Sequence, residues 1–111
     1  NKDSKHINFI ENTIKKYEIG GLIFMQGTAK GHATLINRYQ KISKTPMLIA
    51  TDGEWGLDMR LKNMIKYPYN MSLGAIRDDK LLYDYGKVLG KQMKRLGIHI
   101  NFAPVVDINT N

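Results

Sequence analysis

Charged and aromatic side chains follow directly after an apolar stretch near the middle of the chain. Residues 48–51 have the character of a buried strand, and Asp52, Glu54, Trp55 and Arg60 come next. A carboxylate and a guanidinium form charged hydrogen bonds with hydroxyl groups, and an aromatic ring offers a flat apolar face to a sugar. These residue types in this order predict a site that binds a carbohydrate.

Structural roles would also account for the same residues. Asp52 could cap a local turn, and Trp55 could fill the core of a barrel. Arg60 could pair with Asp52 or Glu54 without ever touching a ligand. The binding interpretation and the structural interpretation both stay open on these residues alone.

A second carboxylate, Asp107, follows the last apolar stretch of the chain. Neighbouring strands lie about 5 Å apart. Asp52 and Asp107 could therefore stand at either separation found in the carboxylate pairs of glycosidases, about 5 Å or about 7 to 9 Å. Spacing alone does not assign an acid and a nucleophile to these two residues.

Helical and extended apolar patterns alternate along the chain. Helices are expected at residues 7–17, 35–42 and 78–96, and strands at 22–25, 47–51 and 98–102. Asp78 can cap the last helix and Gly97 can end it. Strands that are apolar throughout and separated by helices form parallel sheets, so the fold class is α/β.

The spacing of the strands is close to the ~30 residues per unit of an eightfold barrel of about 250 residues. The chain is therefore predicted to be part of a (β/α)8 TIM-type barrel, with about three βα units and parallel strands. In such folds the working groups gather at the carboxyl ends of the strands, where Asp52 is found. The segment 53–77 is predicted to be a long functional loop.

A doubly wound sheet is the rival architecture. Its signature would be a glycine-rich phosphate turn, but residues 26–31 have glycines only at 27 and 31, which does not match the required spacing. Three strands cannot close a barrel and would leave edges and helix faces exposed. Residues 1–111 are therefore expected to be a fragment of a larger barrel domain, or to assemble with other copies or segments.

Composition argues against several classes of function. The net charge is +7, but the 17 basic residues are spread along the chain, so no nucleic-acid partner is expected. Apolar runs are too short for a membrane span. The chain has no cysteine and therefore neither disulfides nor thiolate metal sites. No metal or cofactor is expected, and a cytoplasmic, a periplasmic and a secreted location all remain open.

Several motifs, taken in order, resemble glycoside hydrolase family 3, in the branch that contains the β-N-acetylglucosaminidases. They lie at residues 20–23, 48–56 with Arg60, 68 with 71–75, and 97–107. Trp55 stands where many members of the family have a glycine in a D-x-E-G-G pattern. The resemblance covers most of the chain from residue 20 onward.

The resemblance implies a role for each candidate residue. Asp52 would bind hydroxyl groups of the terminal sugar without transferring a proton, and Arg60 would support it. Glu54 and Trp55 would lie beside the same sugar, and Asp107 would stand behind the site. No catalytic residue is expected within this chain, because the family's Lys-His pair, its His acid/base and its Asp nucleophile come later in the sequence.

The histidines of this chain do not supply those groups. Lys5-His6 lacks the Pro-Gly that follows the family's Lys-His pair, and His32 and His99 are interpreted as structural. The implied activity is removal of a terminal β-linked N-acetylhexosamine, with retention, from a cell-wall fragment or another glycan. The alternatives are a β-glucosidase or β-xylosidase of the same family and a non-catalytic sugar-binding module.

Overall fold

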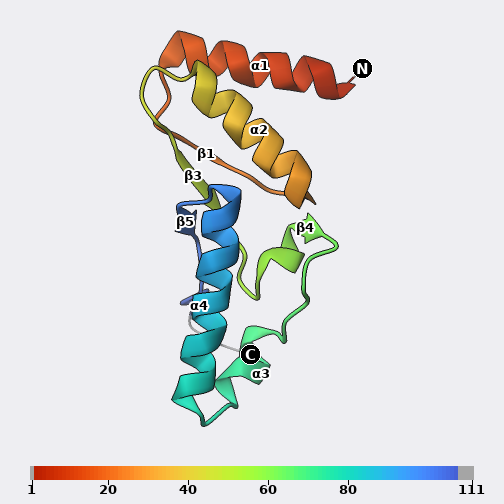
Figure 1. The fold of residues 1–111 in the computed structure, drawn as a ribbon, viewed down its shortest axis with the longest axis vertical. Helices are drawn as coiled ribbons and strands as arrows, with labels where there is room; N and C mark the ends of the chain where they lie inside the picture. The colour runs from red at the N-terminus through yellow and green to blue at the C-terminus, as the bar shows by residue number, and fades with distance from the viewer. Residues whose placement is uncertain (1, 108–111) are drawn as a thin grey trace.

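A computed structural model describes residues 2–107 (Figure 1). The main helices and strands alternate along the chain as α1 (Lys2–Tyr17), β1 (Gly21–Ile23), α2 (Ala29–Ile42), β3 (Leu48–Thr51), α4 (Asp79–Leu96) and β5 (Ile100–Asn101). Short elements lie between them, namely β2 (Gly27–Thr28), the 3-10 helix η1 (Leu57–Met59), β4 (Leu61–Lys62) and α3 (Asn70–Gly74). None of the described helices is long and apolar enough to cross a membrane.

The main sheet has three parallel strands in the order β1-β3-β5. Ala50 in the central strand pairs with Ile23 on one side and with Ile100 on the other. α2 connects β1 to β3 and α4 precedes β5, so each crossover contains a helix, as parallel pairing requires. The predicted α/β class with parallel strands is confirmed.

The long helix α4 begins and ends where its sequence predicts. The Asp78 side chain accepts hydrogen bonds from the backbone amides of Lys80 and Leu81, at 2.9 and 3.2 Å. At the other end Gly97 adopts a left-handed conformation with φ of 78°. The Asp78 side chain and the Gly97 conformation both satisfy backbone groups that a helix end leaves without partners.

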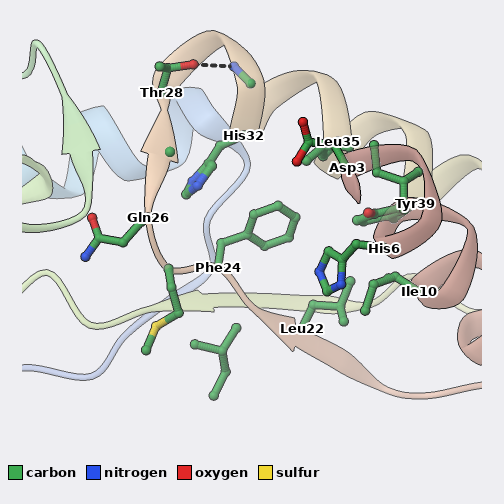
Figure 2. A pocket seen from close by; sticks show the side chains of 15 residues that line it. Asp3, His6, Ile10, Leu22, Phe24, Gln26, Thr28, His32, Leu35 and Tyr39 are labelled. Carbon is green, nitrogen blue, oxygen red and sulfur yellow. Dashed lines mark hydrogen bonds between the residues drawn. The ribbon is translucent and has the colours of Figure 1, made fainter. Parts of the chain in front are cut away.

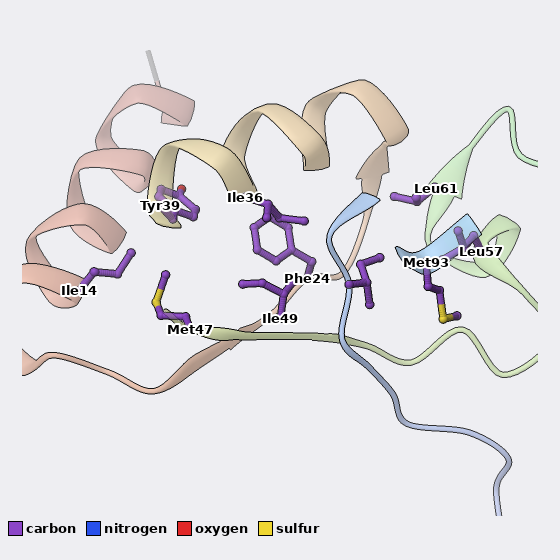
Figure 3. Packing of buried hydrophobic residues seen from close by; sticks show 10 residues of the cluster. Ile14, Phe24, Ile36, Tyr39, Met47, Ile49, Leu57, Leu61 and Met93 are labelled. Carbon is purple, nitrogen blue, oxygen red and sulfur yellow. The ribbon is translucent and has the colours of Figure 1, made fainter. Parts of the chain in front are cut away.

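The core lies between the helices and one face of the sheet (Figure 3). Ile14 from α1, Ile36 from α2 and Met93 from α4 are buried there in one cluster with Ile49 of the central strand. Strand and helix spacing in the sequence predicts these contacts, because every third or fourth residue of a helix lies on one face.

The other face of the sheet is apolar and exposed. Ile23, Leu48 and Phe102 are 60%, 56% and 53% exposed. The total accessible surface is 8367 Å², against about 6,200 Å² expected for a compact monomer of this mass. The radius of gyration is 16.2 Å, against about 13 Å for a compact domain of about 100 residues. The sheet thus has one covered face and one open face.

The segment 53–77, predicted to be a loop, contains regular structure. It folds into η1, β4 and α3, and β4 pairs in parallel with β2 as a second small sheet. Gly27 lies opposite Leu61, and the Gly27 amide donates to the Arg60 carbonyl at 3.0 Å. This small sheet joins the segment after β1 to the segment after β3, at the carboxyl ends of both strands.

Candidate functional site

Asp52 and Arg60 form a two-point ion pair at the carboxyl end of the central strand. The Arg60 Nε donates to Asp52 Oδ1 at 2.6 Å, and Arg60 Nη2 donates to Asp52 Oδ2. The Arg60 side chain is 17% exposed and the Asp52 side chain 26%, so the pair is partly open to solvent. A guanidinium bound in this way fixes the carboxylate plane relative to its own plane.

The ion pair keeps both partners charged. The hydrogen bond from Arg60 lowers the pKa of the Asp52 carboxyl, while partial burial opposes that change. The same hydrogen bond raises the pKa of the Arg60 guanidinium. An ionised carboxylate offers about four lone-pair sites. Arg60 occupies one site on each oxygen and the Asp52 backbone amide also donates to the carboxylate, so only the remaining acceptor capacity is open to a hydroxyl group.

A tight turn brings Arg60 back to the end of the strand that carries Asp52. Gly56 has φ of 116°, and a Cβ there would lie 2.9 Å from the Tyr67 ring, so this turn requires glycine. Leu57 and Leu61 on either side of Arg60 are each 1% exposed. Two buried leucines therefore anchor the segment, and the arginine between them reaches the ion pair.

Gln26 holds Arg60 from the segment that follows β1. With its amide oriented to satisfy both neighbours, the Gln26 nitrogen donates to the Arg60 carbonyl at 3.1 Å, and the Gln26 oxygen accepts from Arg60 Nη1 at 3.0 Å. The sequence indicated Gln26 only as part of a weak phosphate turn. The available signal was its place directly after a strand, which matches the place of Asp52.

Asn101 fixes the backbone next to Asp52. The Gly53 amide donates to Asn101 Oδ1 at 2.8 Å, and Asn101 Nδ2 donates to the Gly53 carbonyl at 3.3 Å. The sequence indicated Asn101 only as a polar position of the last strand. Both backbone groups of the residue after Asp52 are thereby held by a side chain from β5.

Trp55 and Glu54 lie at the edge of the site. Trp55 is partly exposed, and its ring meets Tyr69 edge to face at 4.9 Å and 85°, so it lies outside the buried core of the described residues. Glu54 is partly exposed, and its charge contributes to the raised pKa of Arg60. Of the structural interpretations, the pairing of Arg60 with Asp52 is present, while the absence of ligand contact that went with it stays a prediction.

The remaining candidates lie at the end of the described chain or have structural contacts. Asp107 is exposed at the last described position, and its place behind the site stays a prediction. His99 Nδ1 accepts from the Ile49 amide at 3.0 Å. His32 is only 4% exposed, and burial lowers its pKa. Within residues 2–107 no group of three or more His, Asp or Glu side chains could hold a metal ion.

Comparison with known proteins relates the whole segment to one enzyme family. The model of the glycosyl hydrolase family 3 N-terminal domain matches residues 3–111. Beta-hexosaminidase A of Pseudoalteromonas piscicida is 31% identical over 115 residues, which cover 92% of this chain and 19% of the relative. Beta-hexosaminidase of Thiobacillus denitrificans is 30% identical over 101 residues, which cover 82% of this chain and 28% of the relative.

A third relative has a name that combines two activities. Beta-N-acetylglucosaminidase/beta-glucosidase of Cellulomonas fimi is 29% identical over 93 residues, which cover 84% of this chain and 16% of the relative. The chain thus spans between 16% and 28% of the length of these three relatives.

Proposed function

Because this chain belongs to the N-terminal domain family of the family 3 glycosyl hydrolases, we propose that residues 1–111 are a fragment of the catalytic barrel domain of a glycosidase. The fold of that domain is a TIM-type barrel, and the parallel strands and helices of this chain are part of one. The remaining strands of the parent chain would cover the open face of the sheet and the free edges of β1 and β5. The large exposed surface supports this arrangement.

The proposed reaction removes a terminal β-linked N-acetylhexosamine, such as N-acetylglucosamine, with retention of configuration. A carboxylate nucleophile would form a glycosyl-enzyme intermediate, which water then hydrolyses. The family resemblance assigns the nucleophile and the acid/base to a later part of the parent chain. This fragment would supply one side of the subsite for the terminal sugar and would be inactive alone.

The observation that carries this proposal is the Asp52–Arg60 pair at the carboxyl end of the central strand. Active sites of TIM-type barrels lie at that end of the strands. Asp52 is ionised, partly exposed and held in one plane with the Arg60 guanidinium, and its carboxylate retains acceptor capacity. These are the properties needed to accept a hydrogen bond from a sugar hydroxyl. Trp55 and Glu54 are assigned to the rim of the same subsite.

A β-glucosidase or β-xylosidase of the same family is the second candidate. The name of the Cellulomonas fimi relative includes beta-glucosidase, which supports a β-glucosidase as the alternative. The acetamido group, which distinguishes the two sugar classes, has no partner assigned among residues 2–107. The choice between the substrates therefore depends on the parent enzyme as a whole.

Turnover of aryl glycosides by the full-length parent enzyme tests the proposal. Faster release from the aryl β-N-acetylglucosaminide than from the aryl β-glucoside or β-xyloside is expected, and NMR of the first product should show the β-anomer. The opposite preference would identify the second candidate. Saturable binding of N-acetylglucosamine without turnover would identify a sugar-binding module and contradict a glycosidase.

A further inference from the structure

Several groups hold Arg60 by hydrogen bonds, and only one of them is the carboxylate of the ion pair. Nε and Nη2 donate to Asp52, Nη1 donates to the Gln26 side chain, and the Arg60 carbonyl accepts from Gln26 and from the Gly27 amide. We propose that Gln26 is a positioning residue, which fixes Arg60 and thereby sets the direction in which Asp52 presents its remaining acceptor sites to the sugar. This inference rests on the proposed function of the Asp52–Arg60 pair.

The ion pair alone does not fix its own position. An arginine side chain has several rotatable bonds, and a carboxylate can turn together with the guanidinium that it binds. A contact to Nη1 from a different segment removes that shared rotation. Gln26 provides this contact from the end of β1, while Asp52 follows β3 and Arg60 precedes β4. The guanidinium is therefore held from two separate strand ends.

The backbone that carries Gln26 is itself firmly placed. A Cβ at Gly27 would lie 2.7 Å from His32 Nε2, so the chain runs directly over the buried histidine of α2. Thr28 caps α2 by accepting from the Gly31 amide at 3.1 Å. Figure 2 shows the Gln26 side chain on one side of this segment and the His32 ring on the other. The backbone rests on α2, and the amide is directed away from it.

Gln26 lies outside the hydrophobic core of the described residues, so a substitution at this position should not disturb that core. The test uses the full-length parent enzyme with Gln26→Met, which keeps the length of the side chain and removes both amide hydrogen bonds. We expect kcat/KM for an aryl N-acetylglucosaminide to fall about tenfold, and the inhibition constant of free N-acetylglucosamine to rise by a similar factor. Gln26→Ala should give the same result.

Gln40 offers a matched control at the other end of the central strand. Its side-chain amide also makes two hydrogen bonds, but both are with backbone groups of Met47, at 2.7 and 2.9 Å. Gln40→Met should lower the melting temperature and leave the inhibition constant of N-acetylglucosamine unchanged. Equal changes of the inhibition constant in both variants would mean that Gln26 acts only through stability, and would overturn the proposal.

A double-mutant cycle with Arg60→Ala separates positioning from direct contact with the sugar. If Gln26 acts through Arg60, adding Gln26→Met to Arg60→Ala should change kcat/KM by less than about twofold. If Gln26 touches the sugar itself, the two losses should multiply, and the positioning role would be excluded.

Asp52→Ala distinguishes failure of this inference from failure of the proposed function. A large loss of kcat/KM in Asp52→Ala together with full activity of Gln26→Met would overturn only the role of Gln26. Full activity of Asp52→Ala would remove the ion pair from the sugar site and the role of Gln26 with it.

Discussion

The two ends of the central strand β3 are fastened in the same way but have different surroundings. At the amino end, Gln40 Nε2 donates to the Met47 carbonyl and the Met47 amide donates to Gln40 Oε1. At the carboxyl end, the Asn101 amide holds the two backbone groups of Gly53 in the same manner. Each end of the strand is thus tied to a neighbouring segment by one side-chain amide.

The groups beside these two amides differ. Met47 is 1% exposed and packs in the hydrophobic core, so the amide at that end satisfies backbone groups and holds the strand in place. Gly53 follows Asp52, whose charge is paired with Arg60 and partly open to solvent. Changes at the amino end should therefore affect stability alone. Changes at the carboxyl end should affect stability and the proposed binding of sugar.

Removal of the carboxylate at the carboxyl end should have the largest effect. In the full-length enzyme, Asp52→Ala should lower kcat/KM by about 10²-fold or more, because each charged hydrogen bond to a sugar hydroxyl contributes roughly 1.5 to 3 kcal/mol. Steady-state kinetics with an aryl N-acetylglucosaminide measures this loss. Asp58→Ala in η1 of the same segment is the control and should change kcat/KM by less than about threefold.

The two side-chain amides allow a direct comparison of the strand ends. Asn101→Ala and Gln40→Ala each leave two backbone groups of β3 or its flanks without their partner, so each should destabilise the protein by about 1 to 3 kcal/mol. Only Asn101→Ala should also lower kcat/KM, by about tenfold, because it frees the backbone beside Asp52. Thermal unfolding and kinetics on the same two variants provide both measurements.

An equal loss of kcat/KM in Asn101→Ala and Gln40→Ala would remove the distinction between the two ends. Activity would then follow overall stability, and Asn101 would have no separate role in the site.

Substitution of two glycines by alanine should change the stability of the protein in opposite directions. Gly56→Ala places a Cβ at φ of 116° and 2.9 Å from the Tyr67 ring, so it should destabilise the protein by about 1 to 3 kcal/mol and displace Arg60. Gly90→Ala lies within α4, where the new Cβ meets no atom within 4 Å apart from its chain neighbours and the adjacent helix backbone, and it should stabilise the protein by about 0.5 to 1 kcal/mol. Melting temperatures of the two variants should move in opposite directions.

Local patterns predicted the parts of the fold that depend on near neighbours in the sequence. Asp78 and Gly97 bound α4 because each satisfies backbone groups within a few residues of itself. The apolar run that forms β3 and the place of Asp52 at its carboxyl end also followed from the sequence. The order of the motifs was sufficient to infer the family, and the alternation of strands and helices was sufficient to infer the α/β class.

Contacts between distant segments could not be predicted in this way. β2 and β4 are short pieces that pair only because the turn at Gly56 returns the chain toward Gly27. The partners of Gln26 and Asn101 lie far from them in the sequence, at Arg60 and at Gly53. No periodic pattern reports such a contact, because its existence depends on how two strand ends meet in space.

The smallest expected effect concerns His32. Its ring packs against Gly27, in the segment that carries Gln26. Burial lowers the pKa of His32, so the unfolded chain, where the pKa has its ordinary value of about 6.5, binds a proton more readily than the folded chain. The contribution of neutral His32 to stability is fully present above about pH 6.5 and is lost as pH falls through the lower pKa of the folded state. Melting temperature should therefore decline on acidification.

His32→Gln should reduce the part of that decline that lies just below about pH 6.5, whatever its effect on the melting temperature at neutral pH. His6→Gln on the exposed surface of α1 is the matched control and should retain the full decline. The measurement is the melting temperature of the full-length enzyme between about pH 5 and pH 7.5. Parallel curves for the unmodified enzyme and His32→Gln would show that His32 is not the titrating group. The acid sensitivity would then come from a titrating group elsewhere in the barrel, outside the segment around Gly27 and His32.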